Sequence, residues 1–254
     1  MKRSALLLLV APLVLAACGG SSNAQVKVDP VAYVRHAARV TAATPSEHMK
    51  MTAKMNGRPM TMAMVGSGDY SNTTHTGSFT IGAFRVVLAG TAIYMSSPLM
   101  AQDLPAGKTW VKIDLAAAAR ANGGVDISSL ISRSPTQALQ QLEAAGAVTQ
   151  VGTQTLDGVA TTHYRVKNLD LSKLPQGAKL ETLGHVKYGP IDVWIGNADR
   201  YVYRESMSFT VEASGQSTSM TMRVDFSKFG EKVNVTVPSA SKTTDASVLP
   251  GFGG

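Results

Sequence analysis

Apolar and polar residues alternate with a period of two over much of this 254-residue chain, and this pattern limits the folds open to it. Met49, Met51 and Met55 alternate with polar residues, and similar alternation recurs further along. Because strand side chains point alternately to opposite faces of a sheet, each such segment predicts a strand with one wet face. The predicted strands are 48–56, 60–64, 74–80, 84–89, 91–95, 109–113, 148–155, 159–167, 190–196, 200–213, 217–229 and 233–237.

Turn signals join these segments into meanders. Asn56-Gly57 and Asp157-Gly158 are typical of tight hairpins, in which both turn residues adopt positive φ. We also expect Gly66-Ser67-Gly68 to form a turn. The alternation in 201–211 predicts that its apolar residues share one face, namely Tyr201, Tyr203, Met207, Phe209 and Val211. The chain therefore predicts a long, strongly twisted antiparallel sheet with one apolar face.

Three segments have the features of helices that would cover this face. Asp29-Pro30 supplies an N-cap and a proline at the first helical position, which predicts a helix over 30–43. Ser134-Pro135 and a following glycine predict a second helix at 134–145. Residues 170–183 favour a short helix with a loop, and residues 114–132 a looser segment with short helical pieces. The predicted fold class is α+β, because the apolar face of a sheet must be buried against another layer.

The N-terminus predicts export and lipidation. Lys2 and Arg3 precede an apolar run of about 13 residues, shorter than the ~20 that a membrane-spanning helix needs, so residues 1–17 have the form of a signal peptide. The run ends in Leu-Ala-Ala-Cys18, which matches the lipobox of bacterial lipoproteins, whose cysteine receives diacylglycerol and becomes the new N-terminus. Cys18 is the single cysteine of the chain and cannot form an internal disulfide. An ordinary signal peptide with a chance cysteine is the alternative.

The signal peptide and the lipobox together predict a lipid anchor at the extracytoplasmic face of the cell membrane. Two acyl chains hold a protein on a bilayer far better than one does. Residues 18–29 form the lipidated, flexible tether, and residues 30–237 form the folded domain. The tail 238–254 is rich in Ser, Thr, Gly and Pro, and we expect it to be disordered.

Composition excludes two classes of protein. Hydrophobic residues make up 44% and charged residues 16% of the chain, a balance that supports a core and argues against intrinsic disorder. The formal net charge is +7, but lysines and arginines are scattered singly without interleaved aromatic residues, so no nucleic-acid partner is expected. A mild attraction to anionic lipid headgroups follows from this charge instead.

Five short segments, mostly turns, caps and strand cores, stand in a definite order along the chain. They are Asp69-Tyr70, Gly107–Asp114, Ser134–Leu139, Val151–Tyr164 and Ile191–Ile195. In this order they resemble actinobacterial lipoproteins of the LppX/LprG type, whose wider group shares the LolA-like fold. The resemblance spans residues 30–237 and implies an open half-barrel with helices on its concave face, enclosing an apolar cavity for the acyl chains of envelope lipids. It implies no catalytic residue.

Methionines are the candidate ligand contacts. Of the 12 in the chain, six lie in 49–64 on alternating positions. Three interpretations stay open: core packing, a flexible lipid pocket suited to adaptable thioethers, and a Cu(I) site in which His48 would assist Met49. As cavity-lining residues we single out Met49, Met51, Met62, Met64, Met207 and Phe209.

The sequence lacks the usual marks of an enzyme or a metalloprotein. The histidines are not spaced for zinc, and no Gly-x-Ser-x-Gly elbow is present. Trp110 and Trp194 are expected in the core, with a place at the cavity rim as the alternative. We therefore predict a non-enzymatic protein without metal or cofactor that binds or carries membrane lipids or glycolipids. A sensor or protein-docking module of the same fold is the alternative.

Overall fold

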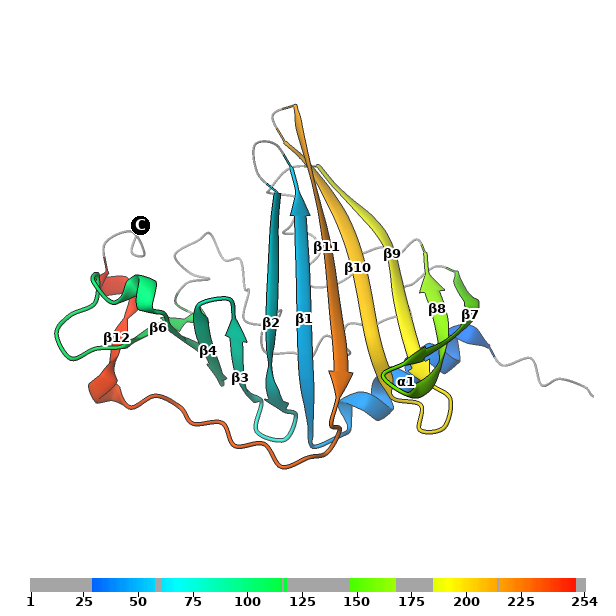
Figure 1. Cartoon of the computed structure of the whole chain (residues 1–254), viewed down its shortest axis with the longest axis horizontal. Coiled ribbons are helices and arrows are strands. Elements are labelled where there is room, and N and C mark those ends of the chain that lie inside the picture. Colours follow the sequence, from blue (N-terminus) through cyan, green and yellow to red (C-terminus); the bar gives the residue numbers. More distant parts are fainter. Residues whose placement is uncertain are drawn as a thin grey trace, which may run out of the picture.

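The computed structural model describes residues 29–57, 61–115, 117, 147–167, 185–213 and 215–249 (Figure 1). Several predicted features lie outside these residues. They are the signal peptide, Cys18 with nearly all of its tether, Met60, the predicted helices at 134–145 and 170–183, most of the segment 114–132, and residues 250–254.

The described residues form one open sheet of 12 strands (Figure 1). Its spatial order is β12-β6-β5-β4-β3-β2-β1-β11-β10-β9-β8-β7. The strands are β1 (Ser46–Asn56), β2 (Thr61–Ser71), β3 (Thr76–Ile81), β4 (Phe84–Ala89), β5 (Ala92–Ser96), β6 (Trp110–Asp114), β7 (Val148–Leu156), β8 (Val159–Val166), β9 (His185–Gly196), β10 (Val202–Ala213), β11 (Gln216–Ser227) and β12 (Thr243–Asp245). Two meanders, β1 to β6 and β7 to β11, join where β1 pairs with β11, and β7 and β12 remain as free ends, so the sheet is not closed into a barrel.

Most of the predicted strands are present, and both predicted hairpins form. The tight turn expected at Asn56-Gly57 is wrong, however, because Asn56 lies in β1 and neither residue has a positive φ. Asp157 and Gly158 have φ of +46° and +85°, and they connect the paired residues Leu156 and Val159 as a two-residue turn. The first hairpin pairs Asn56 with Thr61. All neighbouring strands run antiparallel except β12, which runs parallel to β6.

The prediction of a turn at Gly66-Ser67-Gly68 is wrong, because these residues lie inside β2. A Cβ on Gly68 would lie 2.1 Å from the carbonyl oxygen of Ser78 and 2.6 Å from a ring carbon of Phe79. Phe79 pairs with Gly68 across the strands and occupies the space that a side chain would need. Glycine is required here for the close approach of strand and ring, as glycines in strand interiors often are.

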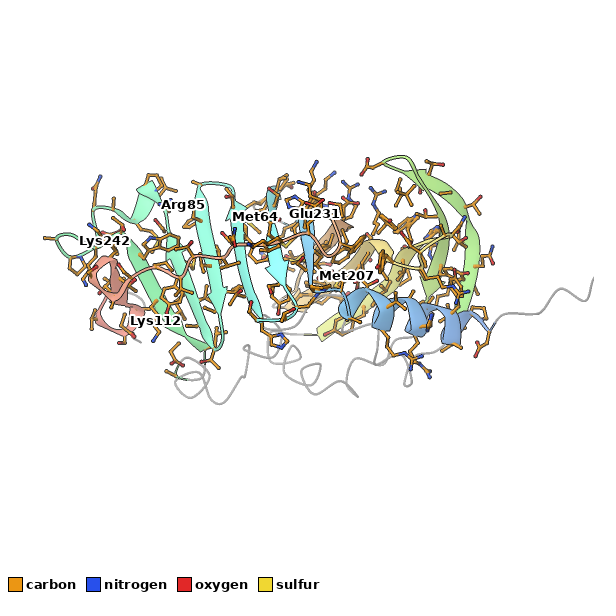
Figure 2. All side chains as sticks on the ribbon, turned by 90° about the horizontal axis from the view of Figure 1, so that it is seen from below. Met64, Arg85, Lys112, Met207, Glu231 and Lys242 are labelled. Atoms are coloured by element: carbon orange, nitrogen blue, oxygen red, sulfur yellow. The ribbon has the colours of Figure 1, made fainter. Side chains whose placement is uncertain are left out.

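One helix, α1 (Pro30–Ala42), is described, and it agrees with the predicted 30–43. The Asp29 carboxylate accepts a hydrogen bond from the Val31 amide at 3.0 Å, as an N-cap does. Val34, Ala37 and Ala38 are fully buried in the main core, which also contains residues of β7 to β11. The helix lies along one side of the sheet (Figure 2). No helix among the described residues is long and apolar enough to cross a membrane.

A buried hydroxyl fastens α1 to the sheet. Thr41 is fully buried, and its Oγ1 donates to the Ala37 carbonyl at 2.9 Å while accepting from the Val202 amide of β10 at 2.8 Å. The Val202 amide has this oxygen as its partner at a β-bulge, where the sheet ladder is interrupted.

The C-terminal part departs from both predictions made for it. Residues 233–237 are not a strand, and residues 240–248 are ordered as two short 3-10 helices around β12. The segment runs below the sheet from β11 to β6, the last strand of the first meander, and adds β12 at its edge (Figure 1). Ala246 and Leu249 are buried there against Val111. The polar composition predicted disorder, but an edge strand offers unpaired backbone groups and an apolar spot that the sequence alone does not reveal.

We expect Thr41→Val, which keeps the shape of the side chain but removes its hydroxyl, to lower the free energy of unfolding by about 1–3 kcal/mol, because it leaves the buried Val202 amide without an acceptor. Urea denaturation measures the change. Thr221→Val, at an exposed position of β11, is the matched control and should change the stability little. Equal effects of the two substitutions would contradict the role given to Thr41.

Candidate functional site

The candidate site is the face of the sheet to which the core belongs, which we call the apolar face. Cross-strand pairing aligns its side chains in rows that run over β2, β1, β11, β10 and β9. The first row consists of Met62, Met55, Met220, Phe209 and Tyr188. The second row consists of Met64, Ala53, Met222, Met207 and Ile191. Together these are the methionine rows, a continuous apolar strip across five strands.

The structure places all six predicted site residues on this face, at different depths. Met49 is buried in the core beside Phe226, and Met51 and Met207 pack partly buried against that core. Met62 and Met64 are 37% and 44% exposed near the β1–β2 hairpin. Phe209 is half-buried, with its ring 6.4 Å from that of Tyr188. The face is thus closed at its helix end, beside α1, and partly exposed at its hairpin end.

Sequence reasoning missed six members of the methionine rows: Met55, Met220, Met222, Tyr188, Ala53 and Ile191. The alternation that would have found three of them is visible in the sequence, since Met55 continues the β1 pattern and Met220 and Met222 stand two apart in 217–229. What the sequence did not supply was the pairing of β11 with β1, which brings Met220 opposite Met55. Tyr188 lies before the predicted start of its strand.

The expectation that Tyr201 and Tyr203 share a face with Met207 fails at a β-bulge. The β9–β10 register shifts between Val202 and Arg204, so Val202 becomes the fully buried residue of this segment. One extra residue in a strand reverses the alternation on its far side. Tyr203 instead packs edge-on against Phe229 and donates a hydrogen bond to Asp199 at 2.6 Å.

Glu205 is an ionisable group in the interior of the apolar face. It is 2% exposed and lies between its cross-strand neighbours Val193 and Val224, both buried. Among the described residues, neither carboxyl oxygen of Glu205 has a hydrogen-bond partner. Burial in these apolar surroundings raises the pKa of the Glu205 carboxyl to about 8, so the group is mostly protonated at neutral pH. The sequence analysis did not single out Glu205, although it continues the alternation of Met207 and Phe209 on the same strand.

A second buried carboxyl lies at the helix end. Glu47 is fully buried and pairs across the strands with Tyr70, which is itself buried. Burial, and to a smaller extent the charge of Glu47, raise the pKa of the Tyr70 hydroxyl. Glu47 lies at the start of β1, four residues before Met51, and is part of the packing at the helix end.

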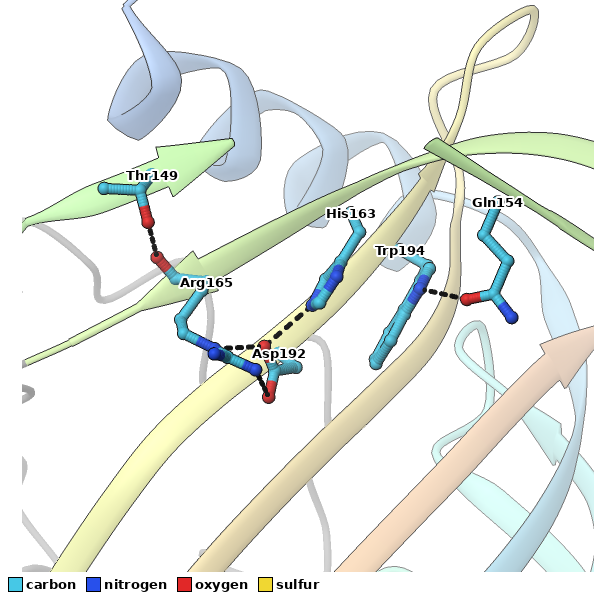
Figure 3. Close-up of polar contacts among 6 residues, drawn as sticks. All are labelled: Thr149, Gln154, His163, Arg165, Asp192 and Trp194. Atoms are coloured by element: carbon cyan, nitrogen blue, oxygen red, sulfur yellow. Dashed lines mark hydrogen bonds and ion pairs between the residues drawn. The ribbon is translucent and has the colours of Figure 1, made fainter. Parts of the chain in front are cut away.

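The opposite face of the sheet is polar. Asp192 accepts hydrogen bonds from Arg165 Nε at 2.8 Å and shares one with His163 Nε2 at 2.7 Å (Figure 3). The His163 ring stacks on Trp194 at 4.2 Å, and Trp194 donates to Gln154 at 2.9 Å. The hydrogen bond and charge of Asp192 raise the pKa of the Arg165 guanidinium.

Both tryptophans differ from the core prediction. Trp194 is half-buried in this polar cluster, and Trp110 is half-buried with the Arg85 guanidinium 5.2 Å from its ring centre. Each therefore serves as a flat platform for a polar neighbour on the surface of the sheet.

The structure separates His48 from Met49, so His48 cannot assist Met49 in the Cu(I) site considered from the sequence. His48 lies on the polar face, where its Nδ1 is 2.7 Å from a carboxylate oxygen of Asp69, whereas Met49 points to the apolar face. Adjacent strand residues cannot reach one ion from opposite faces. Within the part of the chain that the structure describes, no group of three or more His, Cys, Asp or Glu side chains is placed to hold a metal.

A pocket of about 400 Å³ lies at the far end of the sheet, between β5, β6 and the C-terminal segment. Tyr94, Lys112 and Asp245 are among its lining residues. Hydrogen bonds from Ser247, with a contribution from Lys112, lower the pKa of the Asp245 carboxyl. The pocket is distant from the methionine rows along the strand order, so it is a separate feature.

The open sheet is that of a known structure. No family model matches the chain. The crystal structure of LppX, a lipoprotein of Mycobacterium tuberculosis, superposes with a TM-score of 0.53 and 18% sequence identity, covering 82% of this chain and 98% of LppX. The chain has the LolA-like fold of LppX. The resemblance expected from the sequence is therefore confirmed for the fold.

Two further similarities complete the comparison. LprF of Mycobacterium bovis is 14% identical with a TM-score of 0.46, over 83% of this chain and 97% of LprF. An uncharacterized 31.2 kDa protein of Streptomyces griseus, from the rplA–rplJ intergenic region, is 27% identical over 162 residues, 58% of this chain. The chain spans about half the length of that curated relative. Like LppX, these proteins are similar to this chain at low sequence identity.

Glu205 should make stability depend on pH. Its pKa is raised from 4.5 to about 8 on folding, so the folded state keeps a proton that the unfolded state releases. The contribution is full below about pH 4.5 and is lost as the pH rises through about 8, at ~1.4 kcal/mol per pH unit. Glu205→Gln cannot ionise, so its stability relative to the natural protein should rise by several kcal/mol between pH 5 and pH 9.

Urea denaturation at pH 5, 7 and 9 measures this difference. Glu212→Gln, on the same strand with an exposed side chain paired to Lys187, is the control and should show a small difference that changes little with pH. A Glu205→Gln protein whose stability tracks that of the natural protein from pH 5 to pH 9 would show that Glu205 is ionised in the folded state.

Proposed function

We propose that this protein is a membrane-anchored, extracytoplasmic lipoprotein that binds or carries acyl-chain lipids against its apolar face. The methionine rows are the observation that carries the proposal. They form an apolar strip across five strands of an open sheet, and Met62 and Met64 leave its hairpin end partly exposed. Large exposed apolar patches in soluble domains usually mark binding surfaces.

The dimensions of the strip suit an acyl chain. Five strands span four inter-strand spacings of about 4.8 Å, or roughly 19 Å, comparable with an extended chain of a membrane lipid. Each buried methylene contributes about 0.8 kcal/mol, so burying 12 of them favours binding by roughly 10 kcal/mol before the costs of ordering. Binding of this kind needs no catalytic group, which agrees with the proposal of a non-enzymatic protein.

The residue types suit a variable apolar ligand. Methionine side chains are unbranched, have several rotatable bonds and carry a polarizable sulfur, so they adapt to ligands of different shape. Six of the row residues are methionines: Met55, Met62, Met64, Met207, Met220 and Met222. A rigid core would use branched residues instead, as the buried helix end does with Val193, Val224 and Ile195.

The anchor and the helical cover complete the proposal. Lipidation at Cys18 and a tether over 18–29 would hold the domain beside the bilayer from which its ligand comes. LppX, which has the same fold, is itself a lipoprotein. Helices on the concave side, which the resemblance implies, would shield a bound chain from water, and α1 packs into the core of the apolar face.

A charge placed on the strip should weaken lipid binding. Met64→Glu puts a carboxylate where an acyl chain would lie, and the cost of its desolvation should weaken the binding of an apolar probe at least ~10-fold. Displacement of N-phenylnaphthylamine fluorescence by dodecane or methyl laurate measures the affinity, and native mass spectrometry detects lipid retained from expression.

Ala63→Glu is the matched control, because Ala63 is the next residue of β2, is also exposed and points to the polar face. It should bind as the natural protein does. Equal weakening by both substitutions would place the probe elsewhere, and a protein that binds no acyl probe would favour the sensor or docking module instead.

Cys18→Ser should abolish the anchor. The variant should take up no palmitate label in a bacterial host and should leave the membrane fraction, because no thiol remains to receive the diacylglyceryl group. Labelling with alkyne palmitate and cell fractionation measure both effects. A variant that stays labelled and membrane-bound would rule out lipidation at this cysteine.

A further inference from the structure

Glu205 occupies a place on the apolar face where an aliphatic residue would be expected. Its neighbours across the strands are Val193 and Val224, and its neighbour along β10 on the same face is Met207. Glu205 is 2% exposed, and in the described part of the chain both of its carboxyl oxygens lack a hydrogen-bond partner. Buried polar groups are nearly always hydrogen-bonded, so an unsatisfied one in a well-packed strand calls for a physical reason.

The charged side chains on the strands near Glu205 do not provide that reason. The strands next to Glu205 carry charged side chains, but these alternate with the apolar residues and so lie on the polar face. They include Lys50, Arg204, Arg223 and Asp225. Glu47, the other buried carboxyl of the apolar face, lies further along at the helix end, opposite Tyr70. Within the described residues, therefore, no counter-charge faces Glu205, and its hydrogen-bonding capacity is left for something else.

Glu205 lies at the border between the closed core and the methionine rows. Met207, in the second row, is two residues away along β10, a separation of about 7 Å. Met51, Met207 and Met222 surround this border and are only partly buried, unlike Val193 and Val224 on the core side. Glu205 is thus next to the thioethers of the second row, and such unbranched side chains adapt their rotamers to what lies against them.

We propose that Glu205 is the polar anchor of the lipid site, hydrogen-bonding a neutral oxygen group of the ligand, an ester carbonyl or a hydroxyl, while the chain lies along the methionine rows. This inference rests on the proposed function and specifies the class of lipid: one that carries such an oxygen next to its chain, rather than a plain hydrocarbon.

The chemistry of a buried carboxyl fixes this class. In its protonated form the group has one O–H donor and one carbonyl acceptor, so it can donate to an ester carbonyl or exchange hydrogen bonds with a hydroxyl. Its raised pKa of about 8 keeps this form present at neutral pH. An anionic headgroup placed against it would instead have to be desolvated without a counter-ion.

Three probes of equal chain length test the proposal: methyl laurate, 1-dodecanol and dodecane. Their affinities are measured at pH 6.5 by displacement of N-phenylnaphthylamine from the natural protein and from Glu205→Leu, Glu205→Gln and Ser206→Ala. Glu205→Leu removes the hydrogen-bonding group, whereas Glu205→Gln keeps a donor and an acceptor. Ser206→Ala changes the next residue of β10, which points to the polar face.

The decisive quantity is the ratio of ester or alcohol affinity to dodecane affinity. We expect Glu205→Leu to lower this ratio roughly fivefold, the worth of one net hydrogen bond, while dodecane binds at least as tightly as before. Glu205→Gln and Ser206→Ala should keep the ratio of the natural protein. A ratio unchanged in Glu205→Leu, with dodecane still bound, would overturn the anchor and leave the proposed function standing. Failure of every variant and the natural protein to bind any probe would overturn both.

Discussion

The pairing of β1 with β11 is the interaction on which the rest of the structure depends. It joins a meander from the first half of the chain to one from the second, and without it the chain would form two smaller sheets. Because the side-chain period of a strand is two, the register of this single pair decides which residues share a face. Met49 opposite Phe226 and Met55 opposite Met220 place the apolar residues of both halves on one side, and a shift by one residue would expose them all.

The apolar face made in this way is used differently at its two ends. At the helix end, branched residues such as Val193 and Val224 pack against α1, and Thr41 closes the backbone hydrogen bond that a β-bulge leaves open. At the hairpin end, methionines replace them and Met64 is 44% exposed. Branched side chains have few rotamers and specify a fixed core, whereas thioethers adapt to what lies against them. Stability and binding are thus separated along one set of strands, with Glu205 at the border.

The comparison with LppX bears on this division. This chain and LppX are 18% identical and share a fold, so most of their side chains differ. A fold fixed by periodicity leaves the identity of the exposed apolar residues free to vary, so the ligand has to be argued from the residues of each chain. For this chain those residues are the methionine rows and one buried carboxyl.

The sequence by itself determined the local structure: alternation gave the strands, Asp157-Gly158 a hairpin and Asp29-Pro30 the start of α1, because these depend on neighbouring residues. It also placed Met49, Met51, Met62, Met64, Met207 and Phe209 in apolar positions. Only the tertiary structure decided which strands pair. It placed Gly66 and Gly68 inside β2, against Ile81 and Phe79, and it buried Val202 at a bulge. It also docked residues 240–248 on β6. Each of these results from contacts between residues far apart in the chain, where burial and close approach override local preference. The same contacts isolate Glu205 among apolar neighbours, which no local pattern could show.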